Sequence, residues 1–378
     1  MATYIPSSSV GMKINEWYKH IKKFDILEAK RLKAEVESEI EENQDLLLYY
    51  SLVEYRHKIM LQHVNPLALS DDLPDYKKVL EQMENQFNSK KEYDSLISYY
   101  YNFFRGMDEF KNNDYLKAII FYRKAEKHIS AIDEETEKAE FYFKIAEVFY
   151  HMKQTYFSLY YITLARDIFI QDDTFKLKAI QCNLVIAGNL IDGQRHEEAL
   201  TQLTIALQQA KSLKNEYFIS LCTFNLGEVH YTMGNLNKAI PFFEKGIILY
   251  KKTGSINLGK AIYSLATAYF KIGRIDDAQK LCKDGIKAAY NSNDLITQAK
   301  FNYLQALYSE PPNEEVISQT FSFLESKKLF PELEELALDV ANYYSGIESF
   351  ELAISYFNRV TEYRREIQKG ECLYELKI

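Results

Sequence analysis

The chain has 378 residues, of which 47% are hydrophobic and 26% charged, and its formal net charge is −8. This negative balance argues against sequence-independent nucleic-acid binding, because phosphate backbones require clustered lysine and arginine. Only 13 glycines and 7 prolines are present, which disfavours a turn-rich β architecture and suits long helices. The composition therefore predicts an all-α protein with no direct nucleic-acid partner.

The cysteines and the N-terminus indicate the cellular compartment. The four cysteines lie at least 40 residues apart and form no CxxC pair, which argues against a structural zinc site or a disulfide framework. The first ten residues lack the basic start and apolar run of a signal peptide. No stretch of about 18 apolar residues is present to span a membrane. We therefore expect a cytoplasmic protein without membrane contact or a metal of its own.

Residues 11–62 contain three stretches with the apolar periodicity of short amphipathic helices. A plausible capping box, Asp25 with Glu28 three residues on, opens the second stretch, and three polar residues, 42–44, precede the third. The faces expected to be buried are Ile14, Trp17, Ile21 and Phe24, then Ala29, Leu32, Val36 and Ile40, then Leu46, Tyr50, Val53 and Met60. We expect a three-helix bundle over residues 1–65, followed by a helical linker over 66–94.

A repeat of about 40 residues begins near residue 95. Pairs of small residues seven apart start at positions separated by 40, 41, 40 and 39 residues, and two further copies follow. Another small residue lies twelve positions before every start. These seven residues are Gly106, Ala146, Ala187, Gly227, Ala266, Ala306 and Ala341. Paired antiparallel helices need small residues where their backbones approach. Turn signals precede Tyr115, His196, Asn237 and Ile275.

This pattern resembles the tetratricopeptide repeat, lengthened from about 34 residues by longer helices. It predicts a right-handed superhelix of about seven helix pairs over residues 95–378. Counted from the small residue of each first helix, offsets of −6, −2, +1 and +5 share one helical stripe, which in this repeat class faces the concave wall.

The predicted concave stripe is polar. Its residues in three successive repeats are Glu140, Lys144, Glu147 and His151, then Gln181, Val185, Gly188 and Asp192, then Leu221, Asn225, Glu228 and Thr232. Amides can hold an extended peptide backbone and a carboxylate can hold a cationic side chain, so the stripe is typical of a peptide-binding channel. The alternative is a solvated helix face carrying ion pairs.

Six strings distributed along the chain resemble the Rap family of Bacillus response-regulator aspartate phosphatases and their non-catalytic relatives: KINEWY, ENQDLLLYYSLVEYRHKIML, NFFRGM, EKAEFYFKIAEVFY, KQTYFS and AGNLID. The resemblance implies that the bundle binds a response regulator. It also implies that the repeats bind a short signalling peptide that has been secreted and re-imported.

The resemblance assigns the regulator-facing residues on the third predicted helix. Gln44 matches the family's catalytic glutamine, which helps water attack the regulator's aspartyl phosphate. Glu42, Leu48 and Tyr55 are then contacts with the regulator. The partner supplies Mg²⁺, so no cofactor is expected in this chain. From its position alone, Gln44 would be an ordinary solvent-exposed residue. His57, on the same helix, is expected to be a core or interface histidine rather than a phosphate acceptor.

On the peptide side, the family match assigns Asp192 to a cationic group of the peptide and Asn225 to its backbone. Both residues also lie on the predicted concave stripe. Asn189 and Tyr156 are further candidates for peptide binding, and aromatic packing explains Tyr156 equally well. The stripe residues Glu147 and Glu228 complete the predicted peptide-binding set.

Two functions remain open. The chain is either a phosphatase that uses Gln44 on a phosphorelay regulator, or a non-catalytic antagonist that sequesters the DNA-binding domain of a transcription factor. Both branches of the family can carry the glutamine. In either case, we expect the peptide to favour a closed form in which the bundle packs on the repeats. The aromatic stretch over residues 93–104 is the predicted repacking surface.

Overall fold

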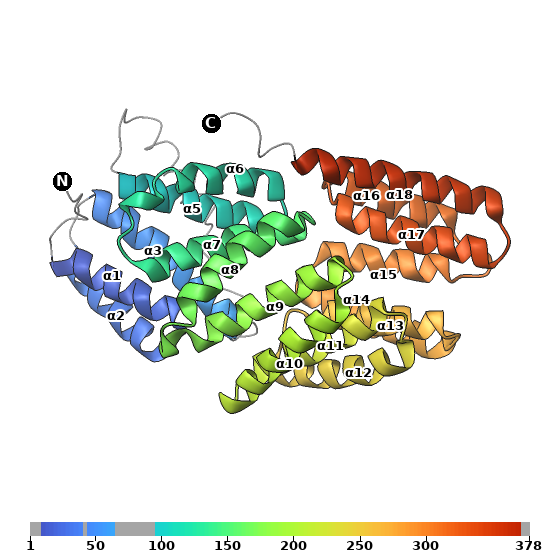
Figure 1. Ribbon diagram of the computed structural model, residues 1–378, viewed down its shortest axis with the longest axis horizontal. Coiled ribbons are helices and arrows are strands. Elements are labelled where there is room, and N and C mark those ends of the chain that lie inside the picture. The colour runs from blue at the N-terminus through green and yellow to red at the C-terminus, as the bar shows by residue number, and fades with distance from the viewer. Residues whose placement is uncertain (1–8, 41–43, 65–94, 372–378) are drawn as a thin grey trace. The chain divides into compact units, whose positions relative to one another are not determined.

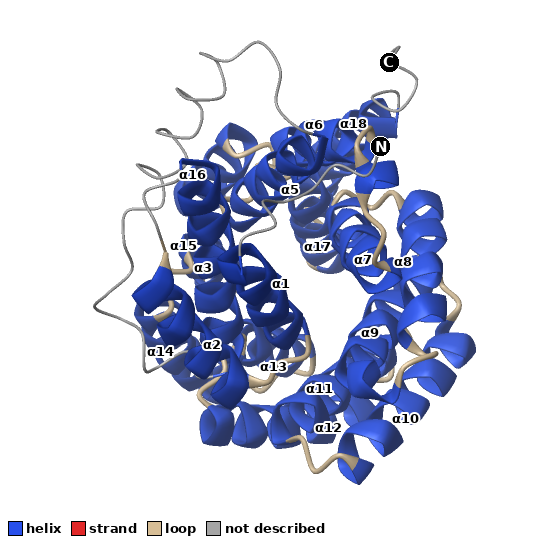
Figure 2. Ribbon diagram, turned by 90° about the vertical axis from the view of Figure 1, so that its left-hand side faces the viewer, coloured by secondary structure: helices blue, strands red, loops and turns tan. Residues whose placement is uncertain are grey.

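The computed structural model describes residues 9–40, 44–64 and 95–371. Within these ranges the chain forms seventeen α-helices and two short 3-10 helices, and no strand occurs (Figures 1 and 2). The predicted all-α class is confirmed. None of the described helices is long and apolar enough to cross a membrane.

The N-terminal helices follow the predicted pattern. They are α1 (Ser9–Lys22), α2 (Ile26–Glu39) and α3 (Gln44–Val64). Nine of the twelve residues expected on the buried faces are at most 5% exposed. The other three, Phe24, Ile40 and Tyr50, are half-buried. Phe24 lies in a left-handed turn with φ of 59°, and Tyr50 donates a hydrogen bond of 2.6 Å to Glu37.

Only half of the predicted capping box is formed. Asp25 is the N-cap of α2, and its carboxylate accepts a hydrogen bond of 3.3 Å from the backbone N–H of Glu28. The Glu28 carboxylate instead accepts from Arg31, one turn further along the helix, at 3.0 Å. The backbone N–H of Asp25 donates to the carbonyl of His20 at 3.0 Å, so the cap does not require the Glu28 side chain.

Fourteen helices after residue 94 form seven consecutive pairs. The pairs are α5 (Ser95–Lys111) with α6 (Tyr115–Glu126), α7 (Glu135–His151) with α8 (Thr155–Phe169), α9 (Lys176–Asp192) with α10 (His196–Ser212), α11 (Glu216–Thr232) with α12 (Leu236–Thr253), α13 (Leu258–Lys271) with α14 (Ile275–Asn291), α15 (Leu295–Leu307) with α16 (Glu314–Ser326), and α17 (Phe330–Gly346) with α18 (Phe350–Glu371). The short helices η2 (Ile129–Ala131) and η3 (Asp173–Phe175) precede α7 and α9. Three of the four predicted starts are met at the expected residue, and α12 begins one residue early.

The small residues lie where the helices of a pair touch. A Cβ added to Gly106 would lie 2.6 Å from the ring of Tyr122, and one added to Gly227 would lie 2.6 Å from Phe243. Gly285 of α14 instead faces the first helix of the next pair, α15, where the distance from an added Cβ to the Phe301 ring would be 2.0 Å. Each of these distances is shorter than van der Waals contact. Glycine suits each position because a buried aromatic ring occupies the space that a side chain would fill. The close-packing reason for the repeat is confirmed.

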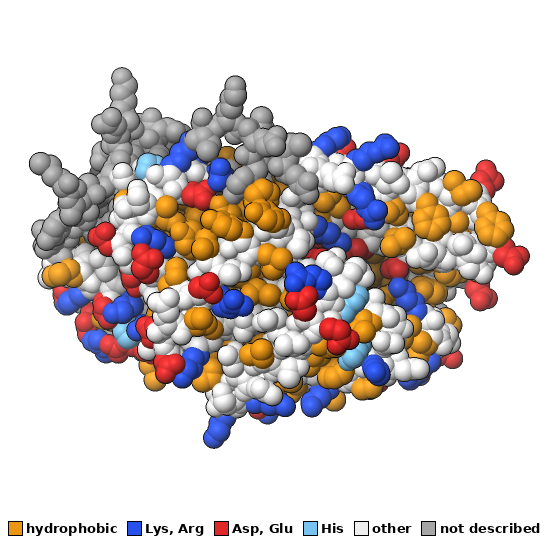
Figure 3. Space-filling model, viewed as in Figure 1, with side chains coloured by type: hydrophobic (Ala, Val, Ile, Leu, Met, Phe, Trp, Pro, Cys, Tyr) orange, Lys and Arg blue, Asp and Glu red, His pale blue; other side chains and the backbone are white. Residues whose placement is uncertain are grey.

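The chain divides into two compact units. One comprises residues 1–145 with 163–179, and the other comprises residues 146–162 with 180–378. The predicted boundaries of the bundle, linker and repeat domain stay predictions, since the linker falls outside the described residues. On the face shown in Figure 3, lysine and arginine side chains of the described residues alternate with aspartate and glutamate, and no continuous basic patch is seen there.

Candidate functional site

The predicted regulator-facing residues belong to α3 and the segment before it. Gln44 is the first residue of α3, and Leu48 and Tyr55 follow four and eleven residues later. At about 100° and 1.5 Å per residue, these three positions lie within about 40° of one another, and Tyr55 is about 16 Å along the axis from Gln44. Glu42 and the side chains of these three residues lie outside the described part, so their roles stay predictions.

The opposite side of α3 is core. His57 is 2% exposed, and its Nδ1 accepts a hydrogen bond of 3.0 Å from the indole N–H of Trp17. Burial, with nearby lysines such as Lys33, lowers the pKa of His57 to about 4. With this pKa the buried imidazole is neutral at pH 7, as expected for a histidine in the core. The core interpretation of His57 is therefore confirmed.

In the second unit, carboxylates from three repeats converge around Tyr150, near the end of α7. Burial raises the pKa of Tyr150 well above its usual value, and the negative charges of Asp192, Glu335, Glu228 and Glu332 raise it further. These four carboxylates come from α9, α11 and α17. Gly188 makes room for this arrangement, because a Cβ there would lie 2.8 Å from the Tyr150 ring.

Asp192, the last residue of α9, reaches solvent, but surrounding protein still desolvates its carboxylate. This burial, with the charges of Glu335 and Glu334, raises the pKa of Asp192 to about 6, against the opposing effect of Lys153. Lys153 itself makes an ion pair of 2.9 Å with Glu335.

Glu228, on α11, is half-buried. Burial raises its pKa to about 7, although the Ser264 hydroxyl opposes the shift. Its Oε1 is buried and has no hydrogen-bond partner. Asp192 and Glu228 are therefore carboxyl groups that a cation would stabilise in their charged form.

The two predicted asparagines differ in how accessible their amide groups are to a ligand. Asn189 is 1% exposed and donates hydrogen bonds from Nδ2 to Ser158 Oγ at 2.8 Å and to the carbonyl of Val185 at 2.9 Å. Its buried Oδ1 has no partner. Asn225 is half-buried and donates from Nδ2 to the carbonyl of Leu221 at 2.8 Å. Asn225 is thus the more accessible of the two amides.

Two other candidates occupy the same unit. Tyr156 lies in the first turn of α8, is 77% exposed, and contacts the ring of Phe157 edge-on with centroids 5.5 Å apart. Glu147, on α7, is half-buried, and burial together with the charge of Glu147 raises the pKa of Tyr217 to about 12. The roles of both residues in peptide binding stay predictions.

One residue of the predicted concave stripe was wrongly placed. Glu140 is completely buried and lies between Arg56 and Lys178, in the first compact unit. Its carboxylate therefore does not line a peptide channel. Its partner Arg56 lies 84 residues away in the sequence, in the bundle, which the repeat register does not include.

Sequence reasoning also missed the contribution of the later repeats, although the signal was present. Applied to Ala341, the −6 and −2 offsets select Glu335 and Asp339 on α17. Applied to Ala266, the −2 and +5 offsets select Ser264 and Lys271 on α13. Lys271 makes an ion pair of 2.9 Å with Asp339. The same offsets therefore also select charged residues of α13 and α17 that pair with each other.

The fold and these side chains define a class: a tetratricopeptide-repeat protein with an N-terminal three-helix bundle and a polar, acidic wall within its repeats. Comparison with known proteins gives the family. Residues 4–62 match the family model described as response regulator aspartate phosphatase H, N terminal, and residues 224–253 match a tetratricopeptide repeat.

Relatives that match along their whole length indicate the same family. Response regulator aspartate phosphatase A of Bacillus subtilis (strain 168) is 42% identical over 380 residues, covering 100% of both chains. Regulatory protein RapC of the same organism is 40% identical, covering 99% of each. A crystal structure of a Rap protein complexed with competence and sporulation factor is 36% identical with a TM-score of 0.88, covering 97% of this chain and 100% of that one. The chain belongs to the Rap family of response regulator aspartate phosphatases.

Proposed function

We propose that this chain is a peptide-regulated aspartate phosphatase that dephosphorylates a phosphorelay response regulator in the cytoplasm. The observation that carries the proposal is its similarity, over the whole chain, to response regulator aspartate phosphatase A. The bundle helix α3, which begins at Gln44, then presents the catalytic face to the regulator.

The reaction is hydrolysis of an acyl phosphate. Water attacks phosphorus, the bond between phosphorus and the aspartyl oxygen breaks, and the products are inorganic phosphate and the free carboxylate. Because the acyl phosphate is already activated, the task left to this chain is to hold water in line, which a neutral amide can do. Mg²⁺ bound in the regulator supplies the charge stabilisation, and Gln44 supplies the orientation.

The direct test is a phosphate-release assay with purified, phosphorylated single-domain response regulators. We expect this chain to accelerate loss of the aspartyl phosphate from at least one of them at catalytic amounts. Phosphorylated regulator alone gives the background rate. If none is dephosphorylated faster than background, the phosphatase proposal fails for those regulators.

A second function is favoured by one relative. The chain named regulatory protein RapC is 40% identical to this one, and its name does not describe a phosphatase. The alternative, which the resemblance to the family's non-catalytic members implies, is an antagonist that binds the DNA-binding domain of a response-regulator transcription factor. A promoter-shift assay tests it directly, since release of DNA without phosphate release would identify this activity.

The ligand of the repeats is proposed to be a short cationic signalling peptide. Support comes from the convergence of Asp192, Glu228 and α17 carboxylates around Tyr150, and from the peptide-bound structure of a relative. Carboxylates that are desolvated and short of cations attract an arginine, lysine or terminal ammonium group. Asn225 is proposed to hold the peptide backbone, because its amide is only half-buried.

Peptide binding is expected to weaken as the pH falls. Asp192 must be ionised to attract a cation, and with a pKa of about 6 it is mostly ionised at pH 7 and mostly protonated at pH 5. The affinity is therefore expected to fall about tenfold between these pH values, following the ionised fraction. Fluorescence anisotropy with a labelled peptide from a panel that includes competence and sporulation factor measures this. Asp192→Asn is the matched control and should remove the tenfold contribution of Asp192, leaving the contribution of Glu228, whose pKa is about 7.

A further inference from the structure

The last helix pair of the repeats, α17 with α18, exposes an apolar surface. Six large hydrophobic side chains of this pair and its turn are between 37% and 60% exposed: Leu338, Ile347, Phe350, Leu352, Ile354 and Phe357. Apolar side chains are seen over α17 and α18 at the right of Figure 3. Single exposed apolar residues are ordinary on a protein surface, whereas a group of them on one element indicates an interaction surface.

The position of Phe357 in the repeat is one that is normally buried. Phe357 lies four residues after Ala353, the first small residue of the pattern in α18, and it is 40% exposed. In the first five repeats, the residues at this position are completely buried: Tyr122, Ile162, Leu203, Phe243 and Cys282. The exposure of Phe357 is therefore a property of the last repeat and not of the repeat pattern.

The same difference is found on the first helix of the pair. Leu338 lies three residues before Ala341 and is 41% exposed, whereas its equivalents Phe103, Phe143 and Tyr303 are at most 3% exposed. In a repeat array each pair is covered by the next, and terminal repeats usually carry a polar outer face. No helix pair follows α18 in the described part of the chain, yet the residues that such a pair would cover are apolar.

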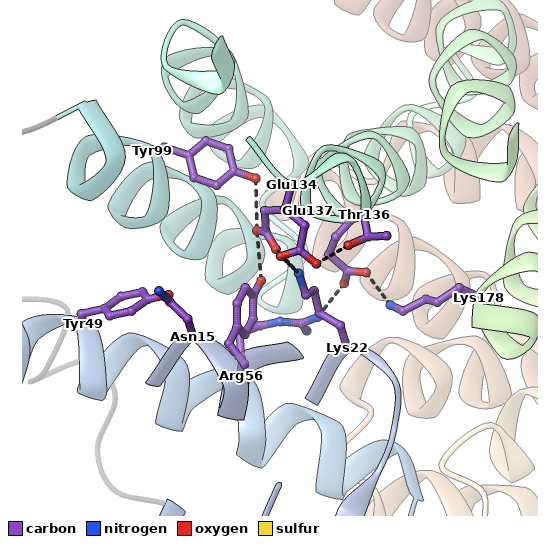
Figure 4. A network of polar contacts seen from close by, with 11 residues as sticks. Asn15, Lys22, Tyr49, Arg56, Tyr99, Glu134, Thr136, Glu137 and Lys178 are labelled. Carbon is purple, nitrogen blue, oxygen red and sulfur yellow. Dashed lines mark hydrogen bonds and ion pairs between the residues drawn. The ribbon is translucent and has the colours of Figure 1, made fainter. Parts of the chain in front are cut away.

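The first repeat does not offer a free face for end-to-end stacking. Tyr100 of α5, in the aromatic stretch over residues 93–104, packs against Tyr49 of the bundle helix α3 with ring centroids 5.3 Å apart. In the same compact unit, Lys22 of α1 forms an ion pair of 3.1 Å with Glu137 of α7 (Figure 4). Because the bundle covers the first repeat, the last pair of one copy has the last pair of a second copy as its matching apolar face. Contact between two identical faces closes as a two-fold dimer.

Three of the exposed side chains form a stripe along α18. Phe350, Ile354 and Phe357 are separated by four and three residues, so they lie within about 60° of one another around the helix. Thr361, which is also exposed, continues the stripe by one turn. A second α18 helix can pack along such a stripe with its side chains between those of the first.

The charges beside the stripe are complementary to those of a second copy. Glu351 and Arg365 are exposed, and neither has an ion-pair partner in the described part of the chain, whereas Arg364 pairs with Glu334 at 2.7 Å. Glu351 and Arg365 lie on the same flank of the stripe, about 21 Å apart along the axis. In an antiparallel pair with its two-fold axis near Asn358, equal flanks meet. Glu351 of each copy then lies opposite Arg365 of the other.

We propose that the exposed face of α17 and α18 is the interface of a homodimer, in which α18 packs antiparallel on α18 of a second copy. Phe357 lies near the two-fold axis, and Ile354 and Phe350 extend the apolar contact to both sides. Two symmetry-related ion pairs, Glu351 with Arg365, border it. Burial of the stripe provides the affinity, and the ion pairs fix the direction and register of the helices. The proposal rests on neither the phosphatase activity nor the peptide.

Sedimentation velocity of the full-length chain over a range of protein concentrations measures the association. We expect the wild type to change from monomer to dimer as the concentration rises. Ile354→Glu combined with Phe357→Glu should give monomer only, because dimerisation would bury unpaired charges. Ile248→Glu is the matched control, since Ile248 on α12 is 67% exposed but lies outside the proposed interface. It should associate as the wild type does, and circular dichroism checks that all variants are folded.

An exchange of charges tests the antiparallel arrangement. Glu351→Arg or Arg365→Glu alone places like charges opposite each other twice in the dimer, so each should weaken self-association about tenfold. In a mixture of the two variants, both ion pairs form again with their charges reversed. The mixture should therefore dimerise about as tightly as the wild type, a result that a change in folding does not produce.

Several results would overturn the proposal. One is a wild type that stays monomeric at every concentration; if removal of residues 372–378 then produced dimers, the C-terminal segment of the chain would be the occupant of the face. Others are dimers that persist in Ile354→Glu with Phe357→Glu, open-ended polymers, or a mixture of charge variants that associates no better than either alone. None of these measurements uses a regulator or a peptide, so failure of the dimer and failure of the proposed function are distinguishable.

Discussion

Gln44→Ala is expected to lower the rate of aspartyl-phosphate hydrolysis at least about 100-fold, while binding of the response regulator changes little. Misplacing a reacting group by an ångström costs about this much, and alanine removes the group that holds the water. Gln44 is the first residue of α3, so the substitution falls at the end of the helix and not in its middle. Single-turnover phosphate release measures the rate, and calorimetric titration of regulator into the variant measures binding.

A glutamine-to-alanine change elsewhere provides the control. Gln171 is exposed in the turn after α8, where its amide donates only to the carbonyl of Asp167, at 3.0 Å. Gln171→Ala should keep the wild-type rate. Retention of the full rate by Gln44→Ala would show that another group positions the water. Loss of regulator binding in that variant would make Gln44 a contact residue instead.

Gly285→Ala is expected to be the most destabilising single-methyl substitution among the repeat glycines. The new Cβ would lie 2.0 Å from Cζ of Phe301, whose side chain is fully buried, so the ring has to move within a packed core. Overpacking of this kind costs about 1–3 kcal/mol. The better helix propensity of alanine returns about 1 kcal/mol at most. Urea denaturation followed by circular dichroism measures the net loss.

Gly346→Ala is the matched control for this prediction. Gly346 is the last residue of the repeat helix α17, and a Cβ added there meets nothing within 4 Å. Alanine is therefore expected to be neutral or slightly stabilising at this position. Equal denaturation midpoints for Gly285→Ala and Gly346→Ala would show that the α14–α15 contact relaxes without cost.

The repeat register was readable from the sequence because its cause is local. A helix pair needs a small residue at a set distance from the turn, and this requirement recurs in every repeat whatever surrounds it. The glycines at 106, 227 and 285, the helix starts at Tyr115, His196 and Ile275, and the shared stripe that later selects Glu335 and Lys271 all follow from that one constraint. The family strings and the catalytic assignment of Gln44 are likewise properties of contiguous residues.

The sequence by itself therefore determined the helix pairs, the small residues where they touch and the family. Only the tertiary structure decided the surroundings of each side chain on the predicted concave stripe. Glu140 and Asp192 both lie on the predicted concave stripe, at offsets of −6 and +5 from the small residue of their repeats. Yet Glu140 is enclosed by Arg56 and Lys178, while Asp192 reaches solvent beside Lys153. Periodicity specifies direction from a helix axis, whereas burial and charge depend on partners dozens of residues away, which local spacing does not encode.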